Sequence, residues 1–108
     1  MAFNNKQYSV AIDEATSGDK VLIAAPSKGF LVVDHIDIIP ESAVDIAFKT
    51  GTTALTGTYA FDAKQGFVQE NPSEWQDGIY TCKNEEAFIM NLGSNVQVSG
   101  YIKYRIMN

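Results

Sequence analysis

The chain has 108 residues, of which 45% are hydrophobic and 19% are charged, and its formal net charge is −5. This length suits one domain with a core that needs no disulfides, and the hydrophobic content excludes a disordered chain. The excess of acids disfavours binding to nucleic acid or to an anionic membrane surface, because both carry negative charge. No apolar run approaches the roughly 18 residues of a membrane-spanning helix.

The N-terminal part of the chain predicts an arm followed by a strand. Residues 1–7 are polar around Phe3 and contain no apolar run, so they are expected to form an arm rather than a signal peptide. Residues 8–108 are expected to form one domain. Its first strand is expected at Tyr8–Ile12, where apolar and polar or small residues alternate, and the next at Val21–Ala25.

Two segments in the middle of the chain are apolar at successive positions rather than at alternate ones. Phe30–Ile39 and Phe88–Leu92 therefore predict central strands, covered on both faces by a second sheet or by a neighbouring subunit. Val44–Phe48 alternates between apolar and polar or small residues, which indicates a strand with one buried face. Ile79–Cys82 is expected to be a further short strand.

The clearest alternation lies near the C-terminus. In Val96–Ile106 the even positions are apolar or glycine, whereas Tyr101, Lys103 and Arg105 are among the odd, polar positions. This pattern predicts a half-buried strand with those three side chains directed to water or to a partner. The segments together give about eight or nine short strands, separated by turns rich in Gly, Asn and Pro, and predict an all-β sandwich or barrel.

Few residues suggest catalytic or metal-binding chemistry. His35 is the only histidine and Cys82 the only cysteine, and both fall within predicted strands. Cys82 is expected to be a small buried hydrophobic residue and His35 to have a structural role, although sequence distance alone does not exclude a Cys–His pair. No zinc, calcium or phosphate-binding motif is present, so no catalytic residue, metal or cofactor is predicted. Acids that converge in space remain an alternative source of a calcium or magnesium site.

Three aromatic residues are candidates for contact with a partner. Trp75 lies in a loop rich in acids and amides, where it suits a protein interface or the edge of the sandwich, and alternatively a sugar ring. Tyr101 lies on the polar face of the last strand, and aromatic residues are enriched at interfaces. Phe3 lies in the polar arm, which we expect to become ordered on a partner surface.

Two stretches resemble small virion proteins of tailed phages. Phe48–Gly57, followed by Phe61 and Gly66–Val68, is similar to a strand of those proteins that ends in a Ser/Thr-Gly-Ser/Thr turn and is followed by Leu-Thr-Gly. Glu85–Tyr104 is similar to their closing hairpin, in which an Asn-Leu turn leads to Val-x-Val-x-Gly and Tyr. The resemblance covers roughly residues 30–106, and the sequence departs from it in Cys82–Asn84 and in the first thirty residues.

The resemblance implies an antiparallel, jelly-roll-like sandwich that forms a homotrimer and decorates a phage capsid. Such a cement protein is not an enzyme: it binds the major capsid protein and stabilises the head. The chain is then expected on the capsid surface of a virion assembled in the host cytoplasm. The alternative is a fibre or receptor-binding head domain that contacts a host glycan. An enzyme built on a β barrel is disfavoured, because such sites gather several histidines and carboxylates and this chain has one histidine.

Overall fold

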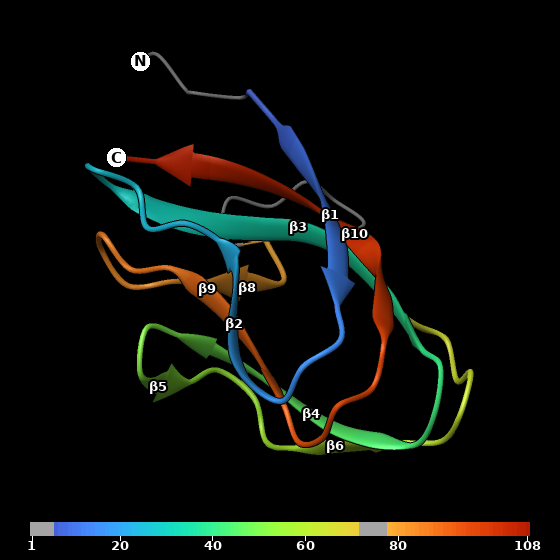
Figure 1. Ribbon diagram of the computed structural model, residues 1–108. Helices are drawn as coiled ribbons and strands as arrows, with labels where there is room; N and C mark the ends of the chain where they lie inside the picture. The colour runs from blue at the N-terminus through green and yellow to red at the C-terminus, as the bar shows by residue number, and fades with distance from the viewer. Residues whose placement is uncertain (1–5, 72–77) are drawn as a thin grey trace.

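A computed structural model describes residues 6–71 and 78–108, which form two five-stranded antiparallel sheets packed face to face (Figure 1). Sheet A contains, in spatial order, β1 (Tyr8–Glu14), β10 (Val98–Met107), β3 (Phe30–Pro40) and β7 (Phe67–Glu70), with β8 (Tyr80–Thr81) also paired to β3. Sheet B contains β2 (Gly18–Ile23), β9 (Phe88–Leu92), β4 (Val44–Thr50) and β5 (Thr53–Ala54), with β6 (Tyr59–Phe61) also paired to β4. The described residues include no helix that could span a membrane. The predicted all-β sandwich is confirmed.

The strand order is that of a jelly roll. Strands of the first half of the chain pair with strands of the second half in reverse order: β1 with β10, β2 with β9, β3 with β7, and β4 with β6. Pairing of β10 with β3 and of β9 with β4 joins these couples into two sheets. This arrangement is a long hairpin rolled over two layers, which is the jelly-roll architecture that was expected.

The observed strands match the predicted ones best where the hydrophobic pattern extends over many residues. β3 and β9 each have strands on both sides, so the prediction of two central strands is confirmed. The expected cover on both faces is not provided by this chain for β3, whose Ile39 is 51% exposed. The second strand lies at Gly18–Ile23 rather than at Val21–Ala25. Strands β6 and β7 were not predicted, since they span only three and four residues.

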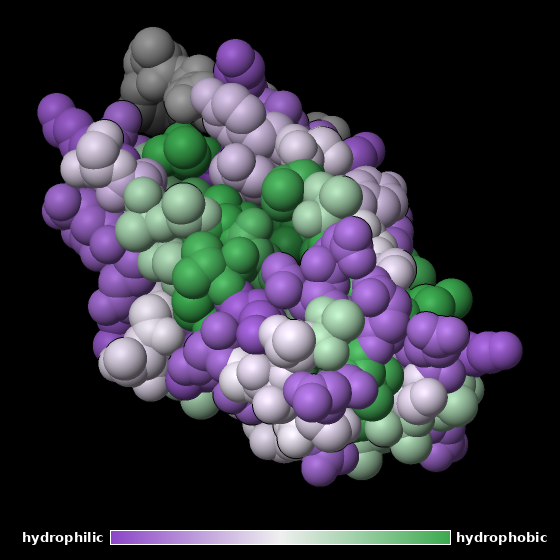
Figure 2. Space-filling model, in the orientation of Figure 1, coloured by the Kyte–Doolittle hydropathy of each residue, from purple (hydrophilic) through white to green (hydrophobic). Residues whose placement is uncertain are grey.

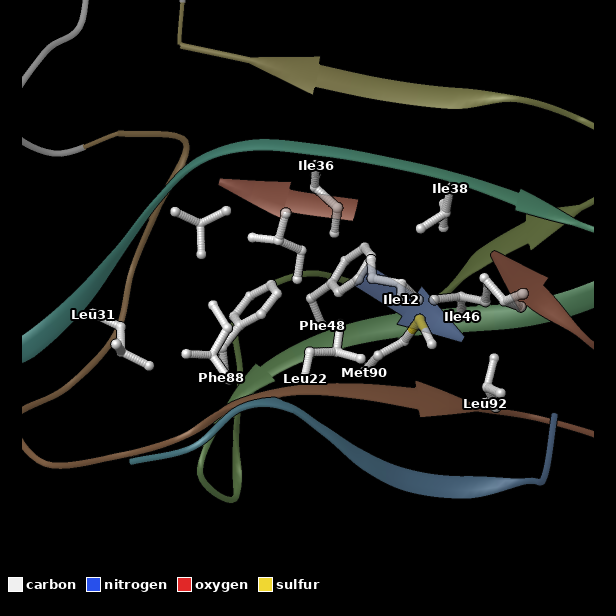
Figure 3. Close-up of a cluster of buried hydrophobic side chains, with 14 of the residues drawn as sticks. Ile12, Leu22, Leu31, Ile36, Ile38, Ile46, Phe48, Phe88, Met90 and Leu92 are labelled. Atoms are coloured by element: carbon white, nitrogen blue, oxygen red, sulfur yellow. The ribbon is translucent and has the colours of Figure 1, made fainter. Parts of the chain in front are cut away.

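The core between the sheets is built from aliphatic and aromatic side chains of both layers (Figure 3). Phe48 of β4 and Phe88 of β9 lie at its centre, with ring centroids 5.6 Å apart and ring planes inclined by 8°. Ile36 and Ile38 of β3 meet them from sheet A and are fully or almost fully buried. These contacts hold the sheets together and fix which side of each strand faces outward.

One side of the sandwich leaves part of the core accessible. Apolar surface gathers there between β1 and β2, the edge strands of the two sheets (Figure 2). Val10 of β1 and Ile106 of β10 pack against the core but remain partly exposed. Lys20 of β2 pairs in register with the buried Met90, and a charge on an edge strand discourages further strand pairing.

Close approach of two strands shapes sheet A at Gly100. A Cβ atom at this position would lie 1.8 Å from the carbonyl oxygen of Asp37 and 3.0 Å from the Cα atom of Ile38. Only glycine therefore allows β10 to lie this close to β3. The next residue in β10 is Tyr101, so the approach also sets the position of that side chain on the outer face.

Candidate functional site

A β-bulge in β3 sets the side chains on the outer face of sheet A. Lys103 pairs with His35 and Tyr104 pairs with Val33, so Asp34 has no partner in β10. Val33 and Ile36 both point into the core on either side of the bulge. Because one residue is inserted between them, Asp34 and His35 both turn to the outer face.

Asp34 is the centre of a buried polar network. Its carboxylate accepts hydrogen bonds from Nε and a terminal nitrogen of Arg105, at 2.6 and 2.7 Å. The side-chain amides of Gln7 and Asn71 donate to the same carboxylate at 3.2 and 3.4 Å. Burial alone would raise the pKa of Asp34, but these hydrogen bonds outweigh it and hold the pKa below its usual value.

The buried pair corrects one prediction made from the alternation in β10. Arg105 was expected to face water or a partner together with Lys103, yet its side chain is only 11% exposed. The predicted side of the sheet was right, since Arg105 does lie on the outer side of sheet A, but the predicted exposure of its side chain was wrong. Asp34, 71 residues earlier in the chain, neutralises the guanidinium within the protein.

His35 and Tyr101 form a second cluster on the same face. Their rings stack with centroids 4.8 Å apart, and His35 Nε2 lies 3.1 Å from Asp37 Oδ2. In register, Tyr101 lies between Ala11 and Asp37. The predicted partner residue Tyr101 thus lies near the middle of the sheet and stacks on a neighbouring ring.

The outer face of sheet A comprises the residues that alternate with the core positions of β1, β10, β3 and β7, together with the bulge residue His35. Besides the buried pair Asp34 and Arg105, they are Ser9, Ala11, Asp13, His35, Asp37, Ile39, Val68, Glu70, Ser99, Tyr101 and Lys103. Two of them are exposed large hydrophobic residues, Ile39 at 51% and Val68 at 66%. The face thus combines exposed apolar side chains with a stacked aromatic ring.

Hollows of different character lie on this face, including one at its edge between Ile39, Lys64 and Ser99. A shallow hollow of about 400 Å³ lies along Ile39, Gly66 and Val68. A smaller one of about 140 Å³ is lined by Gln7, Asp34, His35, Glu70, Asn71 and Lys103. Apolar and aromatic groups beside charged ones are typical of protein contact surfaces.

The only thiol lies away from this face. Cys82 is buried in the core, as predicted, and its backbone N–H donates to the carbonyl oxygen of Leu31. Burial raises the pKa of the Cys82 thiol to about 11, so that it is uncharged near neutral pH. His35 lies on the outer face of sheet A, whereas Cys82 points into the interior, so the two do not form the Cys–His pair that the sequence left open.

The other candidate residues differ in what the structure says of them. Phe3 and Trp75 lie outside the described residues, whereas Tyr101 lies on the outer face of sheet A. Within residues 6–71 and 78–108, no three His, Cys, Asp or Glu side chains are placed to hold a metal ion. The exposed Ile39 and Val68 were not identified from the sequence, because Ile39 ends an apolar run whose outward side was not known and Val68 lies in β7, which was not predicted.

Comparisons with models of known protein families, with curated proteins and with solved structures gave no match. The resemblance of the sequence to phage virion proteins therefore stays a prediction.

Proposed function

We propose that the chain is a non-enzymatic structural protein of a phage virion, a capsid decoration protein that binds the lattice of the major capsid protein and stabilises the head. The jelly roll is compatible with this role but does not select it, because the same architecture also serves lectins and enzymes. The sequence resemblance supplies the family, and the outer face of sheet A supplies the physical argument.

The observation that carries the proposal is the make-up of that face. Ile39 and Val68 expose apolar surface beside Tyr101, whose ring is already ordered by His35. An ordered aromatic side chain loses little entropy when it enters a protein contact. A face of four paired strands with only shallow or small hollows suits binding to another protein surface better than it suits enclosing a small substrate.

A decoration protein also gains from repetition. A capsid offers many identical sites, so a modest contact at each becomes strong when copies are linked. A homotrimer would match local threefold positions of a shell, and this oligomeric state remains a prediction from the resemblance. Placed on the capsid surface, the protein would be assembled with the virion in the host cytoplasm.

The test is binding of the purified protein to emptied heads of the phage that encodes it. We expect co-sedimentation that saturates at a fixed number of copies per head, and heads that withstand higher temperature when decorated. Failure to bind heads would contradict the proposal. If the protein instead changed the fluorescence of its single tryptophan on titration with glycans, the fibre or receptor-binding alternative would take its place.

A further inference from the structure

Two opposite charges on the outer face of sheet A are left without an ion-pair partner within the described part of the chain. Lys103 of β10 and Glu70 of β7 lie in the same row, on either side of His35. Two strand spacings separate their Cα atoms by roughly 10 Å. Glu70 is exposed and Lys103 is partly exposed, so each charge is accessible to a partner.

The register of the strands makes this face complementary to itself. Consider a second copy placed face to face, related by a twofold axis that runs along β3. This axis exchanges β10 and β7, so that Lys103 lies opposite the partner's Glu70, and Glu70 opposite the partner's Lys103. By the same operation, Tyr101 lies opposite the partner's Val68. Two ion pairs and two aromatic–apolar contacts form at once.

Residues of the central strand β3 lie on this twofold axis and face their own counterparts in the second copy. Ile39, which is 51% exposed, meets the partner's Ile39, and the shallow hollow beside Val68 lies where the partner's Tyr101 would enter. On the axis His35 meets the partner's His35, and Asp37 meets the partner's Asp37, which brings two like charges together. His35 Nε2 lies 3.1 Å from the carboxylate within each copy, so each Asp37 already has a polar partner of its own.

We propose that the outer face of sheet A is a contact between two copies of this chain. The inference rests on the proposed function only in treating this face as a contact surface. It adds that the occupant is a second copy, so that capsid-bound molecules are linked to one another while other surfaces hold the capsid protein.

The size of the face sets the strength of the contact. The axis along β3 overlaps three strands of each copy, β10, β3 and β7, and three rows of residues. The footprint is therefore roughly 15 by 20 Å, which is small for a specific interface. We therefore expect an association that depends on protein concentration in solution and becomes strong when copies are held side by side on a lattice.

The experiment is sedimentation equilibrium from tens of micromolar to millimolar concentration. The wild type is expected to approach twice its starting mass, from 11.8 kDa for a single chain or from three chains to six if the predicted trimer also forms. Lys103→Glu alone and Glu70→Lys alone should each abolish the doubling, since like charges then meet twice. An equimolar mixture of these two variants should restore it, because every facing pair is again opposite in charge.

Two controls accompany the measurement. Lys28→Glu changes the net charge as Lys103→Glu does but lies in the exposed loop between β2 and β3, so it should still double. Thermal unfolding of each variant checks that its fold is intact. A wild type that never doubles, single variants that double normally, or a mixture that fails to restore doubling would each overturn the proposal.

The outcomes also separate this inference from the proposed function. If the chain binds heads but never doubles, the capsid protein is the occupant of the face and the function stands. If it doubles with the expected charge dependence but ignores heads, the self-contact stands and the decoration role is wrong.

Discussion

The outer faces of the two sheets differ in whether their charged side chains form ion pairs within the chain. On sheet B, Lys49 Nζ lies 2.9 Å from Asp19 Oδ2, and the side-chain amide of Asn91 donates to Asp19 Oδ1 at 2.7 Å. These bonds lower the pKa of Asp19. On sheet A, Lys103 and Glu70 remain apart, beside two exposed hydrophobic residues.

The difference indicates which face has charged and apolar side chains left without contacts in a single copy of the chain. Charged groups in water gain little from pairing, so an unpaired surface Lys or Glu has no cost in the isolated chain. The outer face of sheet A is informative because unpaired charges of opposite sign lie on the same face as the exposed apolar side chains of Ile39 and Val68. Sheet B carries one exposed large hydrophobic residue, Val21. Asp19 and Lys49 near it are paired with each other, whereas Asp45 of β4 has no ion pair within the described residues.

The largest effect is expected at Arg105, the cation of β10 whose ion-pair partner, Asp34, lies in the same chain. Arg105→Ala leaves the buried Asp34 without its main partner, and we expect a loss of about 3–5 kcal/mol in the free energy of unfolding. Lys103→Ala, two residues earlier on the same face, should change it by less than about 0.5 kcal/mol. Urea unfolding of both variants is the measurement, and equal losses would show that the buried pair has no special weight.

A smaller effect is expected where β10 approaches β3. Gly100→Ala places a methyl group against the carbonyl oxygen of Asp37 and should cost about 1–3 kcal/mol by forcing the strands apart. Gly57 provides a matched control, since a Cβ atom there would have no neighbour within 4 Å. A Gly100→Ala variant as stable as Gly57→Ala would contradict the close approach of the two strands.

The narrowest effect concerns pH. The pKa of Asp34 is lower in the folded chain than its unfolded value of about 3.9, so its ionised form stabilises the fold above that pH. This contribution is lost as the pH falls through the folded pKa. The stability advantage of the wild type over Asp34→Asn should therefore shrink below about pH 4, as measured by urea unfolding between pH 3 and pH 7. A constant difference would argue against an ionised Asp34 in the pair.

Much of the fold was predictable because long strands carry a strong pattern. The alternation in residues 96–106 placed Val98 and Ile102 in the core, and both are fully buried. The apolar run at 30–39 identified the central strand β3. Short strands such as β6 and β7 were missed, since three or four residues show too little periodicity to be recognised.

The contact face was only partly predictable. Tyr101 was identified from its position among polar residues, and it does lie on the outer face. The bulge at Asp34 was not foreseen, because an inserted residue shifts the alternation without changing the composition of the strand. The pairing of Asp34 with Arg105 joins residues far apart in the chain, and neither local pattern indicates the other.

The central claim is that sheet A, and not sheet B, offers a face to a second copy. Backbone amide chemical shifts measured over increasing protein concentration test it most directly, because they report on each strand separately. We predict shifts that grow with concentration at Ile39, Val68 and Tyr101, while Asp19, Lys49 and Asn91 stay constant. Shifts confined to the sheet B residues, or none on either face at millimolar concentration, would contradict the account.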